Sequence, residues 1–311
     1  MELILEAVKN VRVGEPASYK NLTVFPLFGI DLKAADYLTL DEALKKKCCK
    51  ITEVSEGGSV PELKFVNSGA QPVFLLDGEQ LIGAKQNRVL NLSIMVAGGV
   101  VVVIPVSCVE AGRWHHSTSH FAAASNLHYA EGRAQKMAQV SKSMRSTGRR
   151  TSNQSEVWEN IASKSSRFGV ASETSAMSDI FYQAESRIED YAHHFSTVEG
   201  QSGAMFAING RVIGLEMFDS AETLKKLFPK LMNSYGLDAL DRERGDQCGT
   251  EAICATGDVD AFLKRILEAP KEEFDAVGEG RDIRISGKNL TGAALVVDKR
   301  LVHLSAFEVE S

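Results

Sequence analysis

Apolar positions in the first third of the chain come in short alternating or continuous runs, which are typical of β-strands. The expected strands are residues 22–28, 50–54, 63–66, 73–76, 80–82 and 89–96, followed by the valine-rich run 100–106. Asp77-Gly78 lies between two of these runs and is a dipeptide that type I′ hairpins favour, because both central residues need positive φ. We therefore predict a hairpin at Asp77-Gly78, a meander of antiparallel strands over residues 63–108, and one short helix at residues 39–47.

The pattern changes near Arg113. No proline occurs between residues 122 and 198, and helix-forming residues replace the strand-like alternation. The expected helices are residues 130–144, 155–163 and 178–194, and the Ser/Thr/Arg-rich segment 146–153 is expected to connect the first two. The middle third is thus predicted to be a helical insert or lobe.

The last third returns to a mixed pattern. Asn209-Gly210 predicts a hairpin over residues 204–216, and Asp219 and Glu222 stand in capping-box register for a helix at residues 220–235. A second helix is expected at residues 259–269. The tail has three strand-like runs, residues 281–286, 293–297 and 300–308, which are expected to form a small antiparallel sheet.

Runs of strands followed by runs of helices, rather than strict alternation, predict an α+β fold. We expect an antiparallel β-meander core, a helical middle lobe and a C-terminal α/β segment that ends in a small antiparallel sheet. The predicted parts are a β-rich part at 1–114, a helical insert at 115–200 and a mixed α/β part at 201–311. They are expected to form one compact domain of residues 15–311.

Composition and charge narrow the classes of protein. The hydrophobic content of 44% and the charged content of 24% are ordinary for a globular protein, so disorder is not expected. The net charge of −6 gives no global attraction to nucleic acid or to an anionic membrane, and neither is expected as a partner. Any site for an anion must therefore be local.

The cysteines and the N-terminus bear on the compartment. The number of cysteines is odd and there is no C-x-x-C pair; the five are Cys48, Cys49, Cys108, Cys248 and Cys254. The first residues carry acids where a signal peptide has positive charge. The longest apolar run, residues 100–106, is far shorter than the roughly 20 residues of a spanning helix. A cytoplasmic protein is the expectation.

The polar stretch between two apolar strands at residues 79–88 is the first candidate site. Its side chains are Glu79, Gln80, Lys85, Gln86, Asn87 and Arg88. Lys and Arg bring positive charge, while Gln and Asn bring donors and acceptors, and such a set suits a phosphate next to a sugar or base. The alternative is a solvated loop in which Asn87 makes a local turn.

Glu110, Arg113 and Trp114 follow the valine-rich strand, where a rigid scaffold commonly places binding side chains. Arg113 can pair with an anion while Trp114 offers a stacking face. A structural Glu110–Arg113 ion pair, with Trp114 in the core, explains the same residues equally well. Exposure of Trp114 would distinguish these two hypotheses.

Three histidines, His115, His116 and His120, raise the question of a metal site near Glu110. Adjacent histidines on an extended segment point to opposite sides, whereas metal ligands must converge. We predict a flexible polar loop here, with no metal and no cofactor.

The segment from Gly132 to Ser155 contains no acid, although the whole chain is acidic. Its cations are Arg133, Lys136, Lys142, Arg145, Arg149 and Arg150. Arg133 and Lys136 are three residues apart, and so are Lys142 and Arg145, which places each pair on one helical face. The segment can be a solvated basic face of a helix or a site for a phosphate group, and the sequence does not decide between them. Proteins that bind single-stranded nucleic acid interleave aromatic residues with the cations, and such aromatic residues are missing here.

Gln201 is a further candidate for lining a site, whereas Asp219 has a sufficient role as a helix cap. Several common motifs are absent from the sequence: G-x-S-x-G, G-x-x-x-x-G-K-[ST], H-E-x-x-H and a strand–G-x-G-x-x-G–helix fingerprint. The cysteines also lack the spacings of zinc knuckles. Common hydrolases, kinases and Rossmann dehydrogenases are therefore disfavoured.

Four segments together resemble one little-characterised family, the ARG-and-rhodanese-phosphatase-superfamily-associated proteins. They are LLDGEQLIGAKQNRVLNLSI from residue 75, IPVSCVEAGRW from 104, QSEVWENI from 154 and GQSGAMFAINGRVIGLEMFD from 200. The resemblance covers roughly residues 15–240. The family's association with ADP-ribosylglycohydrolases and rhodanese-like phosphatases implies a place in ADP-ribose or phosphoester metabolism, and implies an enzyme of ADP-ribose metabolism as a partner. It assigns no catalytic residues.

Three hypotheses on function follow. The first is a protein that binds a phosphate-bearing small molecule such as an ADP-ribose-like nucleotide. The second is a hydrolase-type enzyme acting on a nucleotide-sugar or phosphoester, with Lys85, Arg88 and Arg113 neutralising phosphate and Glu79 or Glu110 as general acid or base. The third is an accessory protein that docks a partner enzyme. Whether the protein is an enzyme stays open, and binding is preferred because no acid–base pair stands out.

Overall fold

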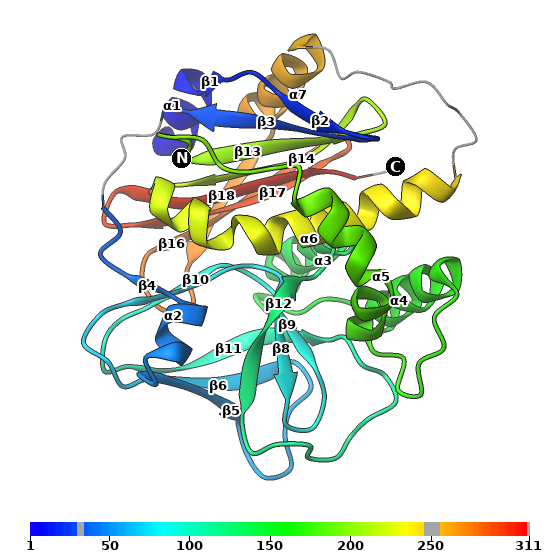
Figure 1. The fold of residues 1–311 in the computed structure, drawn as a ribbon. Coiled ribbons are helices and arrows are strands. Elements are labelled where there is room, and N and C mark those ends of the chain that lie inside the picture. The colour runs from blue at the N-terminus through cyan, green and yellow to red at the C-terminus, as the bar shows by residue number, and fades with distance from the viewer. Residues whose placement is uncertain (30–33, 246–255, 310–311) are drawn as a thin grey trace.

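The computed structural model describes residues 1–29, 34–245 and 256–309. Its elements form layers (Figure 1). Helices α1 (Glu2–Asn10) and α7 (Thr256–Glu268) cover one face of a large antiparallel sheet. The other face carries the remaining long helices, and beyond them lies a lobe built from two smaller sheets. The fold class is α+β, as predicted.

The large sheet has nine strands drawn from both ends and the middle of the sequence. In spatial order they are β1 (Arg12–Val13), β3 (Leu22–Phe28), β13 (Gly203–Ile208), β14 (Arg211–Phe218), β18 (Arg300–Glu308), β17 (Leu290–Val297), β16 (Arg281–Gly287) and β15 (Lys271–Asp275), with β2 (Ala17–Tyr19) paired to β3. Blue, green and red strands therefore lie side by side in Figure 1. The three tail strands expected to form a small antiparallel sheet do pair antiparallel, as β16, β17 and β18, and they are part of this larger sheet.

Both faces of the nine-stranded sheet are buried. On the α1/α7 side, Leu215 and Leu304 pack with Ile4 and Phe262. On the other side lie α3 (Ala130–Thr147), α4 (Gln154–Phe168), α5 (Met177–Ala192) and α6 (Ala221–Gly245). Each fully buried aliphatic or aromatic side chain contributes about 1.5–3 kcal/mol, so this double burial anchors the fold. No helix in the described residues is long and apolar enough to cross a membrane.

The second lobe contains the candidate stretch at residues 79–88. Its six-stranded sheet has the order β12 (Phe121–Leu127), β8 (Glu79–Gly83), β9 (Arg88–Leu90), β11 (Val101–Cys108), β6 (Glu62–Asn67) and β5 (Cys49–Glu53). A three-stranded sheet has the order β10 (Ile94–Val96), β7 (Val73–Leu75) and β4 (Leu38–Thr39). Helix α2 (Leu40–Lys45) starts at a capping box between Thr39 and Glu42.

The predicted hairpin at Asp77-Gly78 is wrong. The strands on its two sides belong to different sheets, since β7 pairs with β10 and β4 while β8 pairs with β9 and β12. Only Gly78 has positive φ, 82°, and the amide of Glu79 donates to the carbonyl of Leu76. That turn has the φ pattern of type II, which moves the chain from one sheet to the other. The predicted antiparallel strands are present, with β8, β9, β11 and β6 paired in that order, but residues 89–96 split between β9 and β10, which belong to different sheets.

Local signals were more successful elsewhere. Asn209 and Gly210 have φ of 50° and 74°, and β13 and β14 form the predicted hairpin. The three helices expected in the middle third are confirmed as α3, α4 and α5. Strand β12 lies in the segment predicted to be helical, and α6 continues through Pro229 well beyond residue 235. Helix α1, with Ile4 and Val8 on its buried face, was not predicted.

Candidate functional site

Glu110 and Arg113 form a bidentate ion pair at the end of β11. Arg113 Nε lies 2.9 Å from Glu110 Oε1, and Nη2 lies 2.7 Å from Oε2. Arg113 also donates to the carbonyl of Ala84 and to Asn87 Oδ1, at 2.6 and 3.2 Å. Burial alone would raise the pKa of Glu110, but its hydrogen bonds with Arg113 and the Asn87 amide outweigh this and lower it. The ion pair thus holds the turn between β8 and β9.

The amide side chains of this turn are also bonded within the protein. Gln86 Nε2 donates to the carbonyl of Glu110 at 2.7 Å, and Gln86 Oε1 accepts from Arg88 Nη1 at 3.1 Å. Asn87 Oδ1 accepts from the amide of Gly83 at 3.2 Å. The structure therefore brings together Gln86, Asn87, Arg88, Glu110 and Arg113, and most of their hydrogen-bonding groups face one another.

Arg88 and Trp114 differ from the rest of this group. Arg88 is fully buried, and its Nε and Nη2 have no hydrogen-bond partner in the described part of the chain. Trp114 is 45% exposed, and its ring centroid lies 5.6 Å from the Arg88 guanidinium carbon and 5.4 Å from Lys85 Nζ. Lys85 Nζ also donates to the carbonyl of Gly57 at 2.7 Å. Trp114 is thus outside the core and forms cation–π contacts with both cations.

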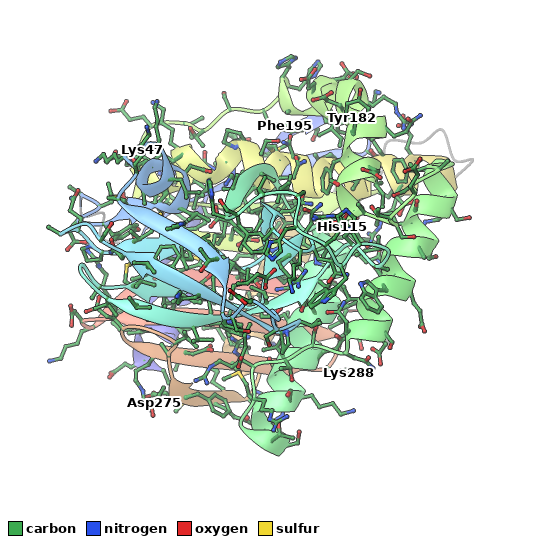
Figure 2. The ribbon with its side chains drawn as sticks, turned by 90° about the horizontal axis from the view of Figure 1, so that it is seen from below. Lys47, His115, Tyr182, Phe195, Asp275 and Lys288 are labelled. Atoms are coloured by element: carbon green, nitrogen blue, oxygen red, sulfur yellow. The ribbon has the colours of Figure 1, made fainter. Side chains whose placement is uncertain are left out.

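The three histidines lie on the exposed loop that follows Trp114. Figure 2 views the molecule from the side of the six-stranded sheet and labels His115. Within the residues that the structure describes, no group of three His, Cys, Asp or Glu side chains is placed to hold a metal ion. In the same part of the chain Cys48, Cys49 and Cys108 are free thiols, whereas Cys248 and Cys254 lie outside the described residues.

Glu79 lies in a different environment from Glu110. Its carboxylate pairs with Lys230 of α6 at 2.9 Å and accepts from the amide of Leu76 at 2.9 Å. Burial raises the pKa of Glu79. Neighbouring Gln80 is buried, and its side-chain amide has no partner among the described residues. The two candidate acids, Glu79 and Glu110, therefore bond to different cations and do not act as a pair.

Helix α3, which carries the first cations of the acid-free segment, contacts Asp77 rather than the Lys85–Arg88 stretch. Arg133 and Lys136 are fully buried and both form ion pairs with Asp77. Arg133 Nη1 also lies 2.5 Å from Glu216 Oε1 on β14. We call Asp77, Arg133, Lys136 and Glu216 the core cluster. The other cations of the run are Lys142, Arg145, Arg149 and Arg150, which are exposed or partly exposed.

Gln201 and Asp219 also have contacts within the protein. Gln201 Oε1 accepts from the amide of Val198 at 3.0 Å, and its Nε2 donates to the carbonyl of Gly203 at 2.8 Å. Asp219 accepts from the hydroxyl of Tyr37 at 2.5 Å and pairs with Arg300 at 2.9 Å. Helix α6 begins at Ala221, two residues later, so the prediction of Asp219 as its cap is wrong.

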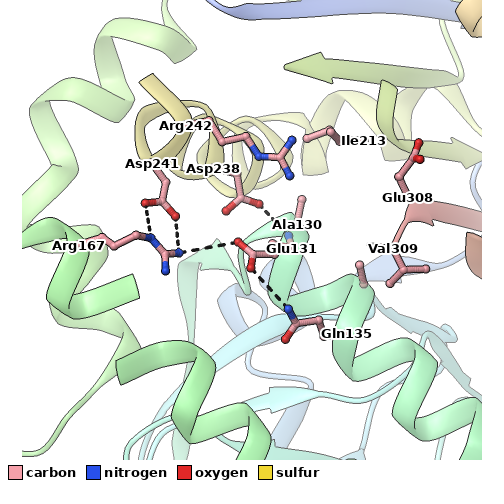
Figure 3. Close-up of a pocket in the computed structure, with 11 residues that line it drawn as sticks. Ala130, Glu131, Gln135, Arg167, Ile213, Asp238, Asp241, Arg242, Glu308 and Val309 are labelled. Atoms are coloured by element: carbon pink, nitrogen blue, oxygen red, sulfur yellow. Dashed lines mark hydrogen bonds and ion pairs between the residues drawn. The ribbon is translucent and has the colours of Figure 1, made fainter. Parts of the chain in front are cut away.

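A pocket that was not predicted lies where the start of α3, the end of α4 and the C-terminal part of α6 meet the end of β18. Its volume is about 420 Å³. Its polar lining residues are Glu131, Gln135, Arg167, Asp238, Asp241, Arg242 and Glu308. Figure 3 shows these side chains around one space. We call it the Arg242 pocket.

Buried ion pairs form the floor of the Arg242 pocket. Lys164 is fully buried and lies 2.7 Å from both Asp238 and Asp241, while Arg167 bonds to both oxygens of Asp241 at 2.7 and 2.6 Å. Asp238 also accepts from the backbone amide of Glu131 at 2.7 Å, which caps the first turn of α3. Burial raises the pKa of Asp238 even though Lys164 lowers it.

Arg242 is the distinctive residue of this pocket. Its guanidinium extends into the space in Figure 3, and it has no hydrogen bond or ion pair with any described residue. Each carboxylate around it already has a cation: Lys164 or Arg167 on the floor, and Arg265 for Glu308 at 2.8 Å. The pocket thus offers one free guanidinium for an anion, beside carboxylate and amide oxygens that can accept from hydroxyl groups.

Paired spacings were the sequence signal for this pocket. Lys164 and Arg167 stand three residues apart on one helix, and Asp238 and Asp241 stand three apart on another. Residues three apart share a helical face, so two oppositely charged faces were available to dock. Nothing local in the sequence says that these two helices meet, and Glu131 and Glu308 come from two further segments.

The fold and the pocket together define an α+β protein with a charged recess of ligand size. The family model of the ARG and Rhodanese-Phosphatase-superfamily-associated Protein domain matches residues 10–307, and the chain belongs to this family. The resemblance found in the four sequence segments is thereby confirmed. No curated protein matches the chain, and no solved structure matches it.

Proposed function

We propose that this protein binds a phosphate-bearing, hydroxyl-rich small molecule of the ADP-ribose-like class in the Arg242 pocket. The observation that carries this proposal is the guanidinium of Arg242, which has no partner among the described residues and extends into the pocket. Arginine binds phosphate through two parallel hydrogen bonds, and such charge-assisted bonds are the strong ones. A phosphate is therefore the natural partner for this side chain.

The remaining lining side chains suit the sugar part of such a ligand. Glu131 is one-third exposed and Glu308 one-quarter, so both have carboxylate surface that can accept from hydroxyl groups. Gln135 lies beside Glu131, 3.5 Å away, and adds an amide. These residues face the pocket from α3 and β18, while Arg242 faces it from α6.

Size and chemistry limit what the pocket can enclose. Its volume of about 420 Å³ is toward the lower end of the roughly 300–1,000 Å³ of small-molecule sites. The described lining residues include no aromatic ring on which a base would stack. We therefore expect the pocket to recognise a ribose phosphate unit and to leave any attached base outside.

Calorimetric titration with ribose 5-phosphate, AMP, ADP-ribose and ribose tests this proposal. The three phosphorylated compounds should bind, and ribose alone should bind far more weakly. Arg242→Ala should weaken phosphate-dependent binding about tenfold or more, because a hydrogen bond to a charged group contributes about 1.5–3 kcal/mol. Arg149→Ala removes an exposed arginine just after α3 and serves as the matched control.

The Lys85–Arg88 group is the competing position for the same ligand, because Arg88 retains two unbonded donors under Trp114. Loss of binding in Lys85→Ala or Arg88→Ala, with unchanged binding in Arg242→Ala, would move the site there. If none of the four compounds binds the wild-type protein, the small-ligand proposal fails and docking of a partner enzyme becomes the better hypothesis.

A further inference from the structure

A serine, a histidine and a glutamate from separate segments are hydrogen-bonded in a line between the two lobes. Ser93 lies directly before β10, His303 lies on β18 and Glu216 lies on β14. Ser93 Oγ is 2.9 Å from His303 Nδ1, and His303 Nε2 is 2.9 Å from Glu216 Oε2. The neighbouring strands β14 and β18 place the acid next to the imidazole.

The charge on Glu216 decides where the proton of His303 is. Burial alone would raise the pKa of Glu216, but Arg133 and His303 outweigh it, so this pKa lies below its usual value. An ionised carboxylate only accepts hydrogen bonds, so His303 Nε2 carries a proton that it donates to Glu216. In the neutral imidazole Nδ1 is then the acceptor, and the hydroxyl of Ser93 donates to it.

Packing holds the imidazole in this orientation. The ring of His303 stacks on Phe218, with centroids 4.8 Å apart, and lies 6.0 Å from Phe74. Glu216 is held in turn by Arg133 at 2.5 Å. Ser93 Oγ accepts from the backbone amide of Asp77 at 3.0 Å, which leaves its proton directed at Nδ1. Each member is thus positioned before any substrate arrives.

Ser93 and His303 line a small cavity of about 10 Å³ together with Arg284, Asp282 and Ser305. Arg284 is buried and donates from Nη2 to Asp282 at 2.7 Å. Its Nε and Nη1 have no hydrogen-bond partner in the described part of the chain. Two unbonded guanidinium donors on the wall of a cavity that also contains a serine can stabilise an oxyanion.

We propose that Ser93 is the nucleophile of an esterase site. Ser93 Oγ bonds to the acyl carbon as its proton moves to His303 Nδ1, and the carbon–oxygen bond to the leaving alcohol breaks as that alcohol takes the proton. Water then attacks the acyl-serine, His303 takes the water proton and returns it to Ser93 Oγ, and a carboxylic acid leaves. Glu216 is a positioning residue. The cavity of about 10 Å³ has room for about one water, so the ester reaches Ser93 from the side on which this serine is partly exposed.

This proposal does not depend on the Arg242 pocket. Helix α3 separates the two sites, because Met137 lines the Ser93 cavity whereas Ala130, Glu131, Ala134 and Gln135 line the pocket. Ligand binding can therefore fail in the Arg242 experiment while Ser93 still reacts with the probe. Equally, the ligand can bind at Arg242 while Ser93 does not react.

A fluorophosphonate probe, read by mass spectrometry of peptides, tests whether Ser93 is activated. The probe should phosphonylate Ser93 in the wild-type protein and leave no adduct there in Ser93→Ala. His303→Gln should slow labelling about a hundredfold or more, the usual contribution of a general base. Ser107→Ala is the control, because Ser107 is a buried serine whose side-chain partners in the described part of the chain are Asn91 and Ser152 rather than a histidine. Absence of an adduct at Ser93 in the wild type overturns the proposal.

Ser93→Cys covers the case in which His303→Gln does not fold. A thiol at this position should lose its proton to His303, so iodoacetamide should alkylate it about tenfold faster than the thiol of Ser107→Cys. Hydrolysis of p-nitrophenyl acetate should be lost in Ser93→Ala and retained in Ser107→Ala. Equal alkylation rates at the two positions would show that His303 does not activate residue 93.

Discussion

Two charged clusters touch opposite sides of α3 and use the same kinds of side chain. The core cluster joins Arg133 and Lys136 to Asp77 and Glu216, and all four are at most 2% exposed at the side chain. The floor of the Arg242 pocket joins Lys164 to Asp238, Asp241 and Glu131, whose side chains are 2%, 7% and 33% exposed. One cluster is closed between two lobes, and the other opens to solvent on one side.

The difference shows that charge composition alone does not identify a site. A closed cluster uses its charges on one another, and breaking one pair leaves a buried charge without compensation. An open cluster keeps part of its hydrogen-bonding capacity on the solvent side, where a ligand can reach it. The sequence showed both sets of charges, but only the three-dimensional arrangement separates the two roles.

The largest effect is expected from Arg133→Met. This substitution leaves the buried Glu216 without its arginine and removes one of the two cations that bind Asp77. The free energy of unfolding should fall by about 3–5 kcal/mol, the usual result of removing one partner of a buried ion pair. Urea denaturation followed by circular dichroism measures it. Arg149→Met, which changes an exposed arginine, should stay within about 0.5 kcal/mol of wild type. A loss below about 1 kcal/mol in Arg133→Met would contradict the closed character of the core cluster.

A smaller loss is expected from Lys164→Met on the open side. Arg167 still compensates Asp241, and solvent reaches Glu131, so Asp238 is the main charge left alone. The free energy of unfolding should fall by about 2 kcal/mol, within the range for a hydrogen bond to a charged group. The same urea titration applies. If Lys164→Met destabilises the protein as much as Arg133→Met, the two clusters are equally closed and the comparison fails.

The smallest effect is a difference of sign in the dependence of stability on pH. The pKa of Glu216 is lowered in the folded protein, so its contribution is present above the ordinary carboxyl pKa and is lost as pH falls through the lowered value. The pKa of Asp238 is raised by burial, so its contribution is present at low pH and is lost as pH rises through the raised value. Acid should therefore weaken the core cluster and favour the pocket floor.

The opposite pH dependence of the two contributions can be measured from the free energy of unfolding between about pH 7 and about pH 3, because ordinary carboxyl pKa values lie near 4. Glu216→Gln should lose stability on acidification less steeply than wild type, and Asp238→Asn should lose it more steeply. The comparison uses slopes, so a general loss of stability in either variant does not affect it. Equal slopes in the two variants would show that the clusters do not differ in this respect.

Short-range signals in the sequence predicted the elements better than their pairing. Asn209-Gly210 specifies its own hairpin because the turn chemistry is local. Asp77-Gly78 does not, because Arg133 and Lys136, more than fifty residues later, bind Asp77 and hold the chain between two sheets. The Glu110–Arg113 ion pair was weighed as one of two explanations of these residues, and it is observed at a spacing of three residues.

The candidate site residues also divide into those that were visible in the sequence and those that were not. The group from Gln86 to Arg113 was visible in the sequence because its members come from two neighbouring segments. The Arg242 pocket was not, because its charges come from α3, α4, α6 and β18, and the packing of helices far apart in sequence decides which charges meet. The line of Ser93, His303 and Glu216 was missed for the same reason, since its members are separated by 87 residues or more.

The position of β18 has a consequence for how the molecule is made. Its residues, Arg300–Glu308, are the last strand of the described chain, yet they lie between β14 and β17 inside the large sheet. While a ribosome is still making this segment, β14 and β17 each present an edge with unpaired backbone groups, which is a hazard for aggregation. Such long-range pairing also closes slowly. A nascent chain that stops before this segment therefore lacks the strand that joins the sheet, and it also lacks His303.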